Sequence, residues 1–331
     1  MKKLSFKSII ILFSIINFIL ILLNLAIGQI NMSLMELIQG IFTNHNPLNQ
    51  YVILNLRLPR VLIVLFSGIA LAMAGALLQT ISKNDLADPG IIGINSGAGL
   101  GVTIFFLLFV FNAKSFAYLL PFIAFMGGLV SALLIFVLSY HKNKGIHPYK
   151  MILLGVGFSM AASGLMVLLI TSAERDQVQF ITNWLAGNVW GGDWPYVWVT
   201  LPLIVLSVIY IGFQSQTLNI IHLGENHAKG LGVNMKKKQF TYLLIATILA
   251  SVSVAVVGNI AFIGLLSPHI AKQLVGIRHQ KFLPVAGLIG ANIMLASDLL
   301  ARNLIQPNGL PTGILVAFIG TPYFIYLILK K

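Results

Sequence analysis

The sequence has no cysteine and very little charge. The absence of cysteine from all 331 residues excludes disulfide bonds, thiolate metal sites and cysteine nucleophiles. Charged residues make up 9% of the chain, whereas a soluble domain carries about 25%. Hydrophobic residues reach 58% and the mean hydropathy is +0.93. Since this composition cannot cover a water-exposed surface, we expect a membrane protein.

The signatures of nucleotide-binding and hydrolytic enzymes are also missing. The chain has no Gly-x-x-x-x-Gly-Lys-Ser/Thr loop, so it is not an ATPase by itself. It also lacks the His-Glu-x-x-His and Gly-x-Ser-x-Gly motifs, which leaves a membrane enzyme without a catalytic constellation. We therefore expect no catalytic residues.

Acidic residues are scarce and badly placed for ion coupling. The 8 Asp and Glu residues all lie in loops or near the ends of apolar stretches, whereas an ion-coupled carrier normally has ionisable groups in mid-helix. The deepest is Asp298, and Arg302 follows one helical turn later, so we expect a helix-end ion pair. His269 is interpreted as structural. A secondary carrier acting alone stays a distant alternative.

Ten apolar stretches predict the fold. A helix needs about 20 apolar residues to cross a bilayer, and no alternating strand pattern of a β-barrel is present. We predict an all-α, polytopic bundle of about ten transmembrane helices in a single transmembrane domain spanning 1–331. The stretches are 8–28, 60–81, 90–111, 116–139, 150–171, 195–213, 240–258, 260–276, 282–300 and 312–329.

The distribution of Lys and Arg predicts the topology. With the N-terminus inside, 16 of the 21 basic residues fall on the inner side. The outer five are Arg57, Arg60, Lys114, Arg175 and Arg302. The positive-inside rule then places both termini in the cytoplasm. It also accounts for the net charge of +13 without a nucleic-acid partner. Stretch 8–28 is longer than a signal-peptide core of about 7 to 15 residues, so we expect a retained helix.

Two long connections and one helix stand out. Segment 172–194, with Trp184, Trp190 and Trp194, predicts a short outer interfacial helix with aromatic anchors. Segment 214–239 is longer than a simple connection needs, which predicts a docking site on the inner face. Small residues recur every fourth position in several stretches, a spacing typical of close helix packing. In the fifth stretch the hypothetical lining of a translocation pathway is Ser159, Met160, Ser163, Met166 and Thr171.

Several ordered motifs carry a family resemblance. They are Leu-Arg-Leu-Pro-Arg at 56–60, Gly-Ala-Leu-Leu-Gln at 75–79, Leu-Ala-Asp-Pro-Gly at 86–90, Pro-His-Ile at 268–270, Asp-Leu-Leu-Ala-Arg at 298–302 and Leu-Pro-x-Gly at 310–313. In this order and spacing, from about residue 51 to the C-terminus, the chain resembles the permeases of binding-protein-dependent ATP-binding-cassette importers for ferric siderophores, haem and cobalamin.

The resemblance implies a set of partners. It implies a second permease subunit, a copy or a paralogue, with the pathway at their interface. It further implies two cytoplasmic ATPases that use ATP and Mg²⁺, an outer binding protein, membrane lipid around the bundle, and no cofactor or metal held by this chain. The expected cargo is a ferric siderophore, with haem or cobalamin as the alternative, and the expected location is a bacterial cytoplasmic membrane.

The resemblance also assigns residues. Arg57, Arg60 and Arg302 match outer arginines that pair with glutamates of the binding protein, and ordinary interfacial snorkelling is the alternative. The coupling segment to the ATPase is 223–233. Its key residues are Gly224, Glu225, Ala228 and Gly232, and a cytoplasmic gate is placed at His147, Pro148 and Tyr149.

The chain departs from the family pattern at two points. Asn226 and His227 stand where small or acidic residues are usual. Asp85 replaces the proline of an Asn-Pro-Leu turn, and we expect it to cap the following segment.

Overall fold

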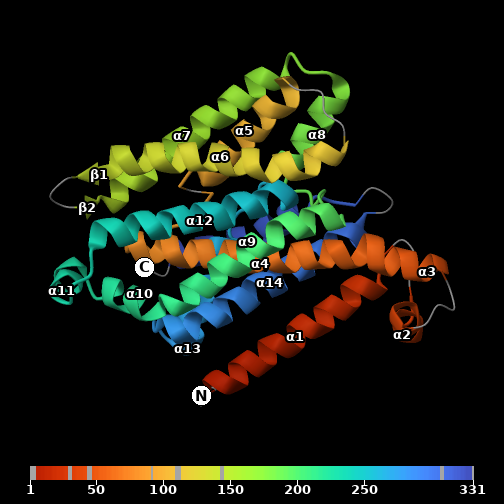
Figure 1. Cartoon of the computed structure of the whole chain (residues 1–331), viewed down its shortest axis with the longest axis horizontal. Helices are drawn as coiled ribbons and strands as arrows, with labels where there is room; N and C mark the ends of the chain where they lie inside the picture. Colours follow the sequence, from red (N-terminus) through yellow and green to blue (C-terminus); the bar gives the residue numbers. More distant parts are fainter. Residues whose placement is uncertain are drawn as a thin grey trace.

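The computed structural model describes residues 5–28, 32–42, 47–90, 92–108, 113–141, 145–305 and 309–329. Helices make up almost all of the described chain (Figure 1). In order, the elements are α1 Phe6–Ala26, α2 Leu34–Phe42, α3 Pro47–Tyr51, the π-helical η1 Val52–Arg57, α4 Leu58–Ser82, α5 Ile94–Leu108, α6 Ala113–Ser139, β1 Tyr140–His141, β2 Gly145–Ile146, α7 Pro148–Ile170, α8 Arg175–Leu185, α9 Trp194–Phe213, α10 Ser215–His222, α11 Glu225–Gly230, α12 Met235–Val257, α13 Ile263–Val275, α14 His279–Leu304 and α15 Thr312–Leu329.

Each predicted apolar stretch contains a helix, but not each helix is long enough to cross a bilayer. Among the described residues, seven helices have the length and hydropathy of a membrane span, and α5 and α15 are shorter apolar helices. Helix α13 has 13 residues, or about 20 Å at about 1.5 Å per residue, against the roughly 30 Å of a hydrocarbon core.

The predicted stretch 260–276 is therefore helical only over Ile263–Val275, and α13 by itself is too short to cross the hydrocarbon core. The physical reason is the backbone at either end of α13. Gly258 and Phe262 have φ of 73° and 69°, which ends α12 and delays the start of α13, and Gly276 has φ of 83° where α13 stops. A left-handed residue cannot continue a right-handed helix.

Helix α4 lies at the centre of the bundle and packs against α12, α13 and α14. Small residues permit the closest approaches. A Cβ atom on Gly75 would lie 1.8 Å from the carbonyl oxygen of Gly264 in α13, and one on Gly68 would lie 2.5 Å from that of Gly290 in α14. The recurrence of small residues along α4 therefore serves backbone contact between helices.

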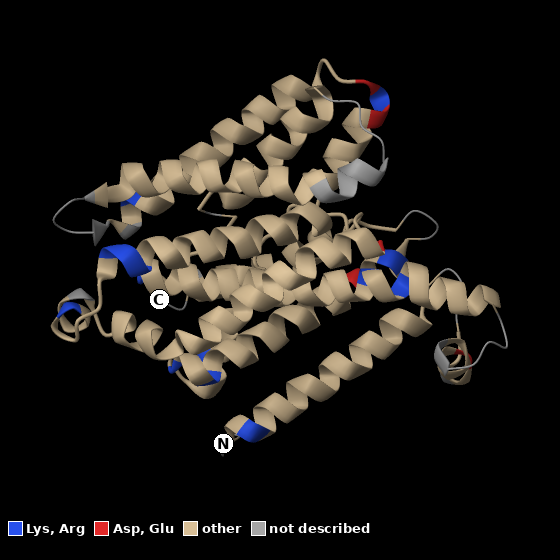
Figure 2. Cartoon of the chain, viewed as in Figure 1, with Lys and Arg blue, Asp and Glu red and all other residues tan. Residues whose placement is uncertain are grey.

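The connections gather at two opposite ends of the bundle (Figure 1). We call these the α8 end, with α2, α3 and α8, and the α11 end, with α10, α11 and the β1–β2 hairpin. Charged residues concentrate at both ends, and Lys and Arg dominate at the α11 end (Figure 2). Six basic residues of the predicted topology lie outside the described residues: Lys2, Lys3, Lys142, Lys144, Lys330 and Lys331.

Two local features differ from the sequence-based expectation. The sequence did not predict the β1–β2 pair, in which Tyr140 lies opposite Ile146. The helix around Leu58–Ser82 begins earlier than residue 60, because α3, η1 and α4 run on as one apolar segment from Pro47 to Ser82. The Leu-Arg-Leu-Pro-Arg motif thus straddles a π-helical turn, a geometry often found at functional sites.

The outer connection 172–194 does form a short helix, α8. Its N-terminus is closed by a capping box between Glu174 and Gln177. The aromatic anchors differ from expectation at one position, since Trp184 is only 2% exposed and belongs to the core. Trp190 and Trp194 donate their indole N–H groups to Ala255 and Leu54 carbonyls at 3.2 and 2.9 Å.

Candidate functional site

A buried carboxylate organises the α8 end. Asp298, in the second-last turn of α14, is 0% exposed. Arg60 of α4 donates from Nη2 to its Oδ1 at 2.8 Å and from Nε to its Oδ2 at 3.3 Å. Arg302 places Nε 3.0 Å from Oδ2, which confirms the expected helix-end pair. The hydroxyl of Thr312, at the start of α15, donates to Oδ1 at 3.1 Å.

The same cluster reaches α1. Arg302 donates from Nη2 to Oδ1 of Asn24 at 2.6 Å, and Nδ2 of Asn24 donates to the Leu295 carbonyl at 3.1 Å. About two helical turns earlier in α1, Nδ2 of Asn17 donates to Oδ1 of Asn292 at 2.8 Å. Four helices, α1, α4, α14 and α15, are thus joined by directional bonds that are costly to leave unmade in an apolar surrounding.

Arg57 does not lie where the sequence reasoning placed it. Its residue is 7% exposed, and its Nη1 donates to the carbonyls of Leu25 and Ala26. A guanidinium at this position satisfies the last carbonyls of α1 and complements the negative end of that helix. The structure therefore corrects the expectation that Arg57 is presented to a partner.

The α11 end presents segment 214–239 as two short helices. Gly224 and Gly232, on either side of α11, have φ of 122° and 77°, which a residue with a Cβ adopts only with strain. Ala228 is fully buried, and its carbonyl accepts from Val233 at 2.9 Å. Leu223 and Leu231 are 65% and 64% exposed, so the loop offers an apolar surface at its tip.

The departures from the family pattern on this segment can be placed. Asn226 and His227 are exposed on α11, and the side chain of Glu225 lies outside the described residues. The outer side of α11 is therefore exposed.

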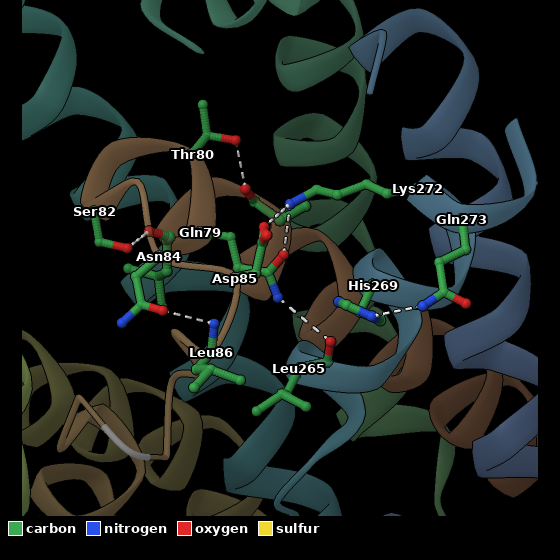
Figure 3. Close-up of polar contacts among 12 residues, drawn as sticks. Gln79, Thr80, Ser82, Asn84, Asp85, Leu86, Leu265, His269, Lys272 and Gln273 are labelled. Atoms are coloured by element: carbon green, nitrogen blue, oxygen red, sulfur yellow. Dashed lines mark hydrogen bonds and ion pairs between the residues drawn. The ribbon is translucent and has the colours of Figure 1, made fainter. Parts of the chain in front are cut away.

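The turn after α4 is tied to α13 (Figure 3). Lys272 of α13 donates from Nζ to Oδ1 of Asp85 at 2.8 Å and to Oε1 of Gln79 at 2.9 Å. The backbone N–H of Leu86 donates to Oδ1 of Asn84 at 2.9 Å. Asn84 thus caps this turn, and Asp85, which was expected to cap, forms an ion pair across to α13 instead.

The expected pathway residues divide between two faces of α7. Ser159, Met160 and Ser163 line an open hollow of about 430 Å³, and Met160 is 72% exposed. Met166 is 3% exposed and packs inward near Gly99 of α5, so its place in the pathway is wrong. Thr171 is exposed just beyond the last turn of α7.

A second open hollow, of about 630 Å³, lies along α15. It is lined by Ile314, Ala317, Phe318, Thr321, Pro322 and Ile325. Like the hollow on α7, it carries hydroxyl and apolar groups and no charged group among its described residues. Both faces suit contact with an apolar partner or a bulky, weakly polar solute.

The proposed gate residues lie at the start of α7. His147 precedes the helix, and its backbone N–H donates to the Ser139 carbonyl at 3.1 Å, which closes the hairpin. Tyr149 is 81% exposed, and the side chain of Pro148 lies outside the described residues. Within the described chain, no group of three or more His, Asp or Glu side chains is arranged to hold a metal ion.

The comparisons with known proteins decide the family. Residues 15–330 match the FecCD transport family. The chain belongs to this family. The iron(3+)-hydroxamate import system permease protein FhuG of Bacillus subtilis (strain 168) is 36% identical over 312 residues, which cover 93% of this chain and 92% of that protein. The Fe(3+) dicitrate transport system permease protein FecD of Escherichia coli (strain K12) is 37% identical over 309 residues, covering 93% and 94%.

A solved structure extends the likeness to three dimensions. A metal-chelate type ABC transporter in an inward-facing conformation superposes with a TM-score of 0.84 and 30% identity, covering 98% of this chain and 100% of that one. The chain is therefore a multi-pass permease subunit of an ATP-binding-cassette importer of the iron-chelate type. ATP is used by partner ATPases, and this subunit is not catalytic. The family and fold expected from the motifs are confirmed.

Proposed function

We propose that this permease carries a ferric siderophore across the cytoplasmic membrane of a bacterium. The observation that carries the proposal is the likeness, over more than nine-tenths of the chain, to permeases named for ferric hydroxamate and ferric citrate import. The uncharged hollows on α7 and α15 agree with it, since a bulky chelate needs a wide path without fixed charge to hold it.

The second permease, a copy or a paralogue, packs against the exposed sides of α7 and α15. Only 17% of an 18-residue stretch of α7 is buried within the subunit. Met160 of α7 and Phe318 of α15 are 72% and 78% exposed. The hollow lined by Ser159, Met160 and Ser163 then faces the interface, where it forms part of the translocation pathway. Tyr149 and its neighbours lie at the α11 end of this pathway as its gate.

The α11 end faces the cytoplasm, with both termini on that side. The concentration of Lys and Arg at this end supports the orientation. Two cytoplasmic ATPases dock on segment 214–239, with Gly224 and Gly232 shaping the coupling segment and Leu223 and Leu231 available for apolar contact.

The binding protein docks at the α8 end through Arg60 and Arg302. Their side chains are 24% and 20% exposed. Arg60 holds Asp298 with its Nε and Nη2 edge and can offer Nη1 to an incoming carboxylate, whereas Arg302 also binds Asn24 through Nη2 and has less of its guanidinium to offer. Arg57 does not contact the binding protein in this proposal, and it holds the end of α1 next to this site.

The docking role has a sharp test. Arg60→Gln paired with Asp298→Asn removes the guanidinium and its internal partner together, so the net charge of the cluster, which also includes Arg302, does not change. If Arg60 docks the binding protein, this double variant stays folded yet binds the loaded binding protein at least tenfold more weakly than the parent. Binding at parental affinity would leave Arg60 a structural residue only.

The cargo is tested by uptake in cells with and without this gene. Radiolabelled iron is supplied as hydroxamate, catecholate or carboxylate siderophores, with labelled haem and cobalamin in parallel. Selective loss of one siderophore class names the cargo. Loss of haem or cobalamin uptake alone would keep the importer and replace the cargo.

A further inference from the structure

A buried histidine lies between the docking segment and the central helix. His279 is the first residue of α14 and is 1% exposed. Its ring Nδ1 lies 2.8 Å from Oδ1 of Asn219 in α10, and its Nε2 lies 2.9 Å from the hydroxyl oxygen of Thr80 in α4. Its backbone N–H also donates to Oδ1 of Asn219 at 2.9 Å. One residue therefore touches three elements through defined atoms.

The roles of these atoms follow from their partners. Nδ2 of Asn219 donates to Oε1 of Gln280 at 2.7 Å, so the carbonyl oxygen of Asn219 faces His279 as an acceptor. Nδ1 of the imidazole then carries a proton, which it donates to Asn219. The Thr80 hydroxyl has a single proton, and it is shared between the Ala76 carbonyl of its own helix, to which it donates at 2.7 Å, and Nε2 of His279. The contact runs unbroken from α10 through α14 to α4.

Packing makes the contact stiff. Leu218 and Ile221 of α10 are fully buried, and α10 packs on both α4 and α14. Thr80 is 2% exposed, so separation of α10 from α4 leaves polar atoms unpaired in an apolar setting. The preceding residue, Gln79, binds Lys272 of α13 at 2.9 Å. The last turn of α4 thus holds α10, α13 and α14 at once.

The opposite end of α4 carries Arg60, bound to Asp298 of α14. Helices α4 and α14 are therefore fastened to each other at both ends, and the glycine contact of Gly68 with Gly290 lies between them. A displacement of α10 is passed along this pair as a unit, because packed helices with fastened ends move together more readily than they slide.

We propose that Asn219, His279 and Thr80 are positioning residues that pass movement of the ATPase-docking segment into α4, and through α4 to the α8 end. This rests on the proposed docking of the ATPase on segment 214–239. The role of the three residues is to keep the docking segment and the central helix in register during the ATP cycle.

The test uses the complete importer, with its ATPase and binding protein, in proteoliposomes. Thr80→Val keeps the shape of the side chain and removes the hydroxyl, and Thr80→Ser restores it. Thr247→Val is the matched control, because Thr247 is equally buried and its hydroxyl donates to Leu243 of its own helix at 2.8 Å. Asn219→Ala breaks the contact from the other side, at an element near the surface.

The readouts are co-purification of the ATPase, ATP hydrolysis, and ATP consumed per cargo molecule moved. We expect Thr80→Val and Asn219→Ala to retain the ATPase but to raise ATP per cargo at least fivefold. Thr80→Ser and Thr247→Val should stay within twofold of the parent. A parental ratio in both Thr80→Val and Asn219→Ala overturns the inference while docking stands. Failure of the parent itself to bind the ATPase through segment 214–239, judged by crosslinking from Leu231, overturns both.

Discussion

Replacing Asp298 by Asn tests whether the ion cluster at the α8 end holds the bundle together. The substitution keeps the size of the side chain and an oxygen that accepts from Thr312, so the change is confined to one negative charge. Arg60 and Arg302 then lie within a few ångströms of each other without their shared carboxylate. Both contacts, at 2.8 and 3.0 Å, are lost as ion pairs.

The magnitude follows from the burial of the three side chains. Breaking a buried ion pair from one side costs about 3–5 kcal/mol. Asp298 is 1% exposed at its side chain, but the arginines are 24% and 20% exposed, so water relieves part of their repulsion. We expect a loss near the lower bound, about 3 kcal/mol, which corresponds to a fall of about 5–10 °C in the midpoint of thermal unfolding.

The assay is the survival of the monodisperse peak on size exclusion after heating in detergent. Asp176→Asn on exposed α8 is the matched control, and it should melt within about 1 °C of the parent because exposed charges contribute little. A D298N variant that melts with the parent would refute the view that this cluster stabilises the contact among α1, α4, α14 and α15.

Three further outcomes are expected. Gly75→Leu should abolish accumulation of folded protein in membranes, measured by fluorescence size exclusion, since even a Cβ there lies 1.8 Å from a backbone oxygen; Gly157→Leu, with open space around it, should accumulate normally. Lys272→Met should lower stability by about 1–3 kcal/mol, because the ion pair with half-exposed Asp85 contributes little but buried Gln79 loses the donor to its Oε1; an unchanged midpoint of thermal unfolding would contradict a role for this contact in holding α13. Gly232→Ala, at φ of 77°, should weaken ATPase binding in pull-down through backbone strain of about 1–2 kcal/mol, whereas equal binding would show that the turn can relax.

Helix positions could be predicted from the sequence because hydrophobic length is a local property. All ten apolar stretches hold a helix, and Asp298 with Arg302 could be paired from spacing alone. The short length of α13 could not be predicted, because the positive φ of Phe262 depends on packing and does not affect the hydropathy of the sequence. The partnership of Arg60 with Asp298 joins residues 238 positions apart, and a single sequence does not show such contacts.

Some residue spacings in the sequence indicated contacts that differ from the predicted site. Met160 and Met166 are six residues apart, which at about 100° per residue separates them by about 120° around α7; only the first faces outward. Asn17 and Asn24 stand in an apolar helix seven residues apart, a pattern typical of polar contact between membrane helices, and both bind α14. Arg57 was placed among the docking residues by the family resemblance, and the carbonyls at the end of α1 bind it inside the subunit instead.

The most direct test of the central claim is cargo transport by the purified importer. Proteoliposomes containing this permease, its permease partner and the ATPase are supplied with binding protein loaded with radiolabelled ferric siderophore. The account predicts uptake that requires ATP on the side of the membrane where the ATPase is bound. This uptake stops when the ATPase is omitted. Equal uptake without the ATPase, driven by an ion gradient alone, would contradict it.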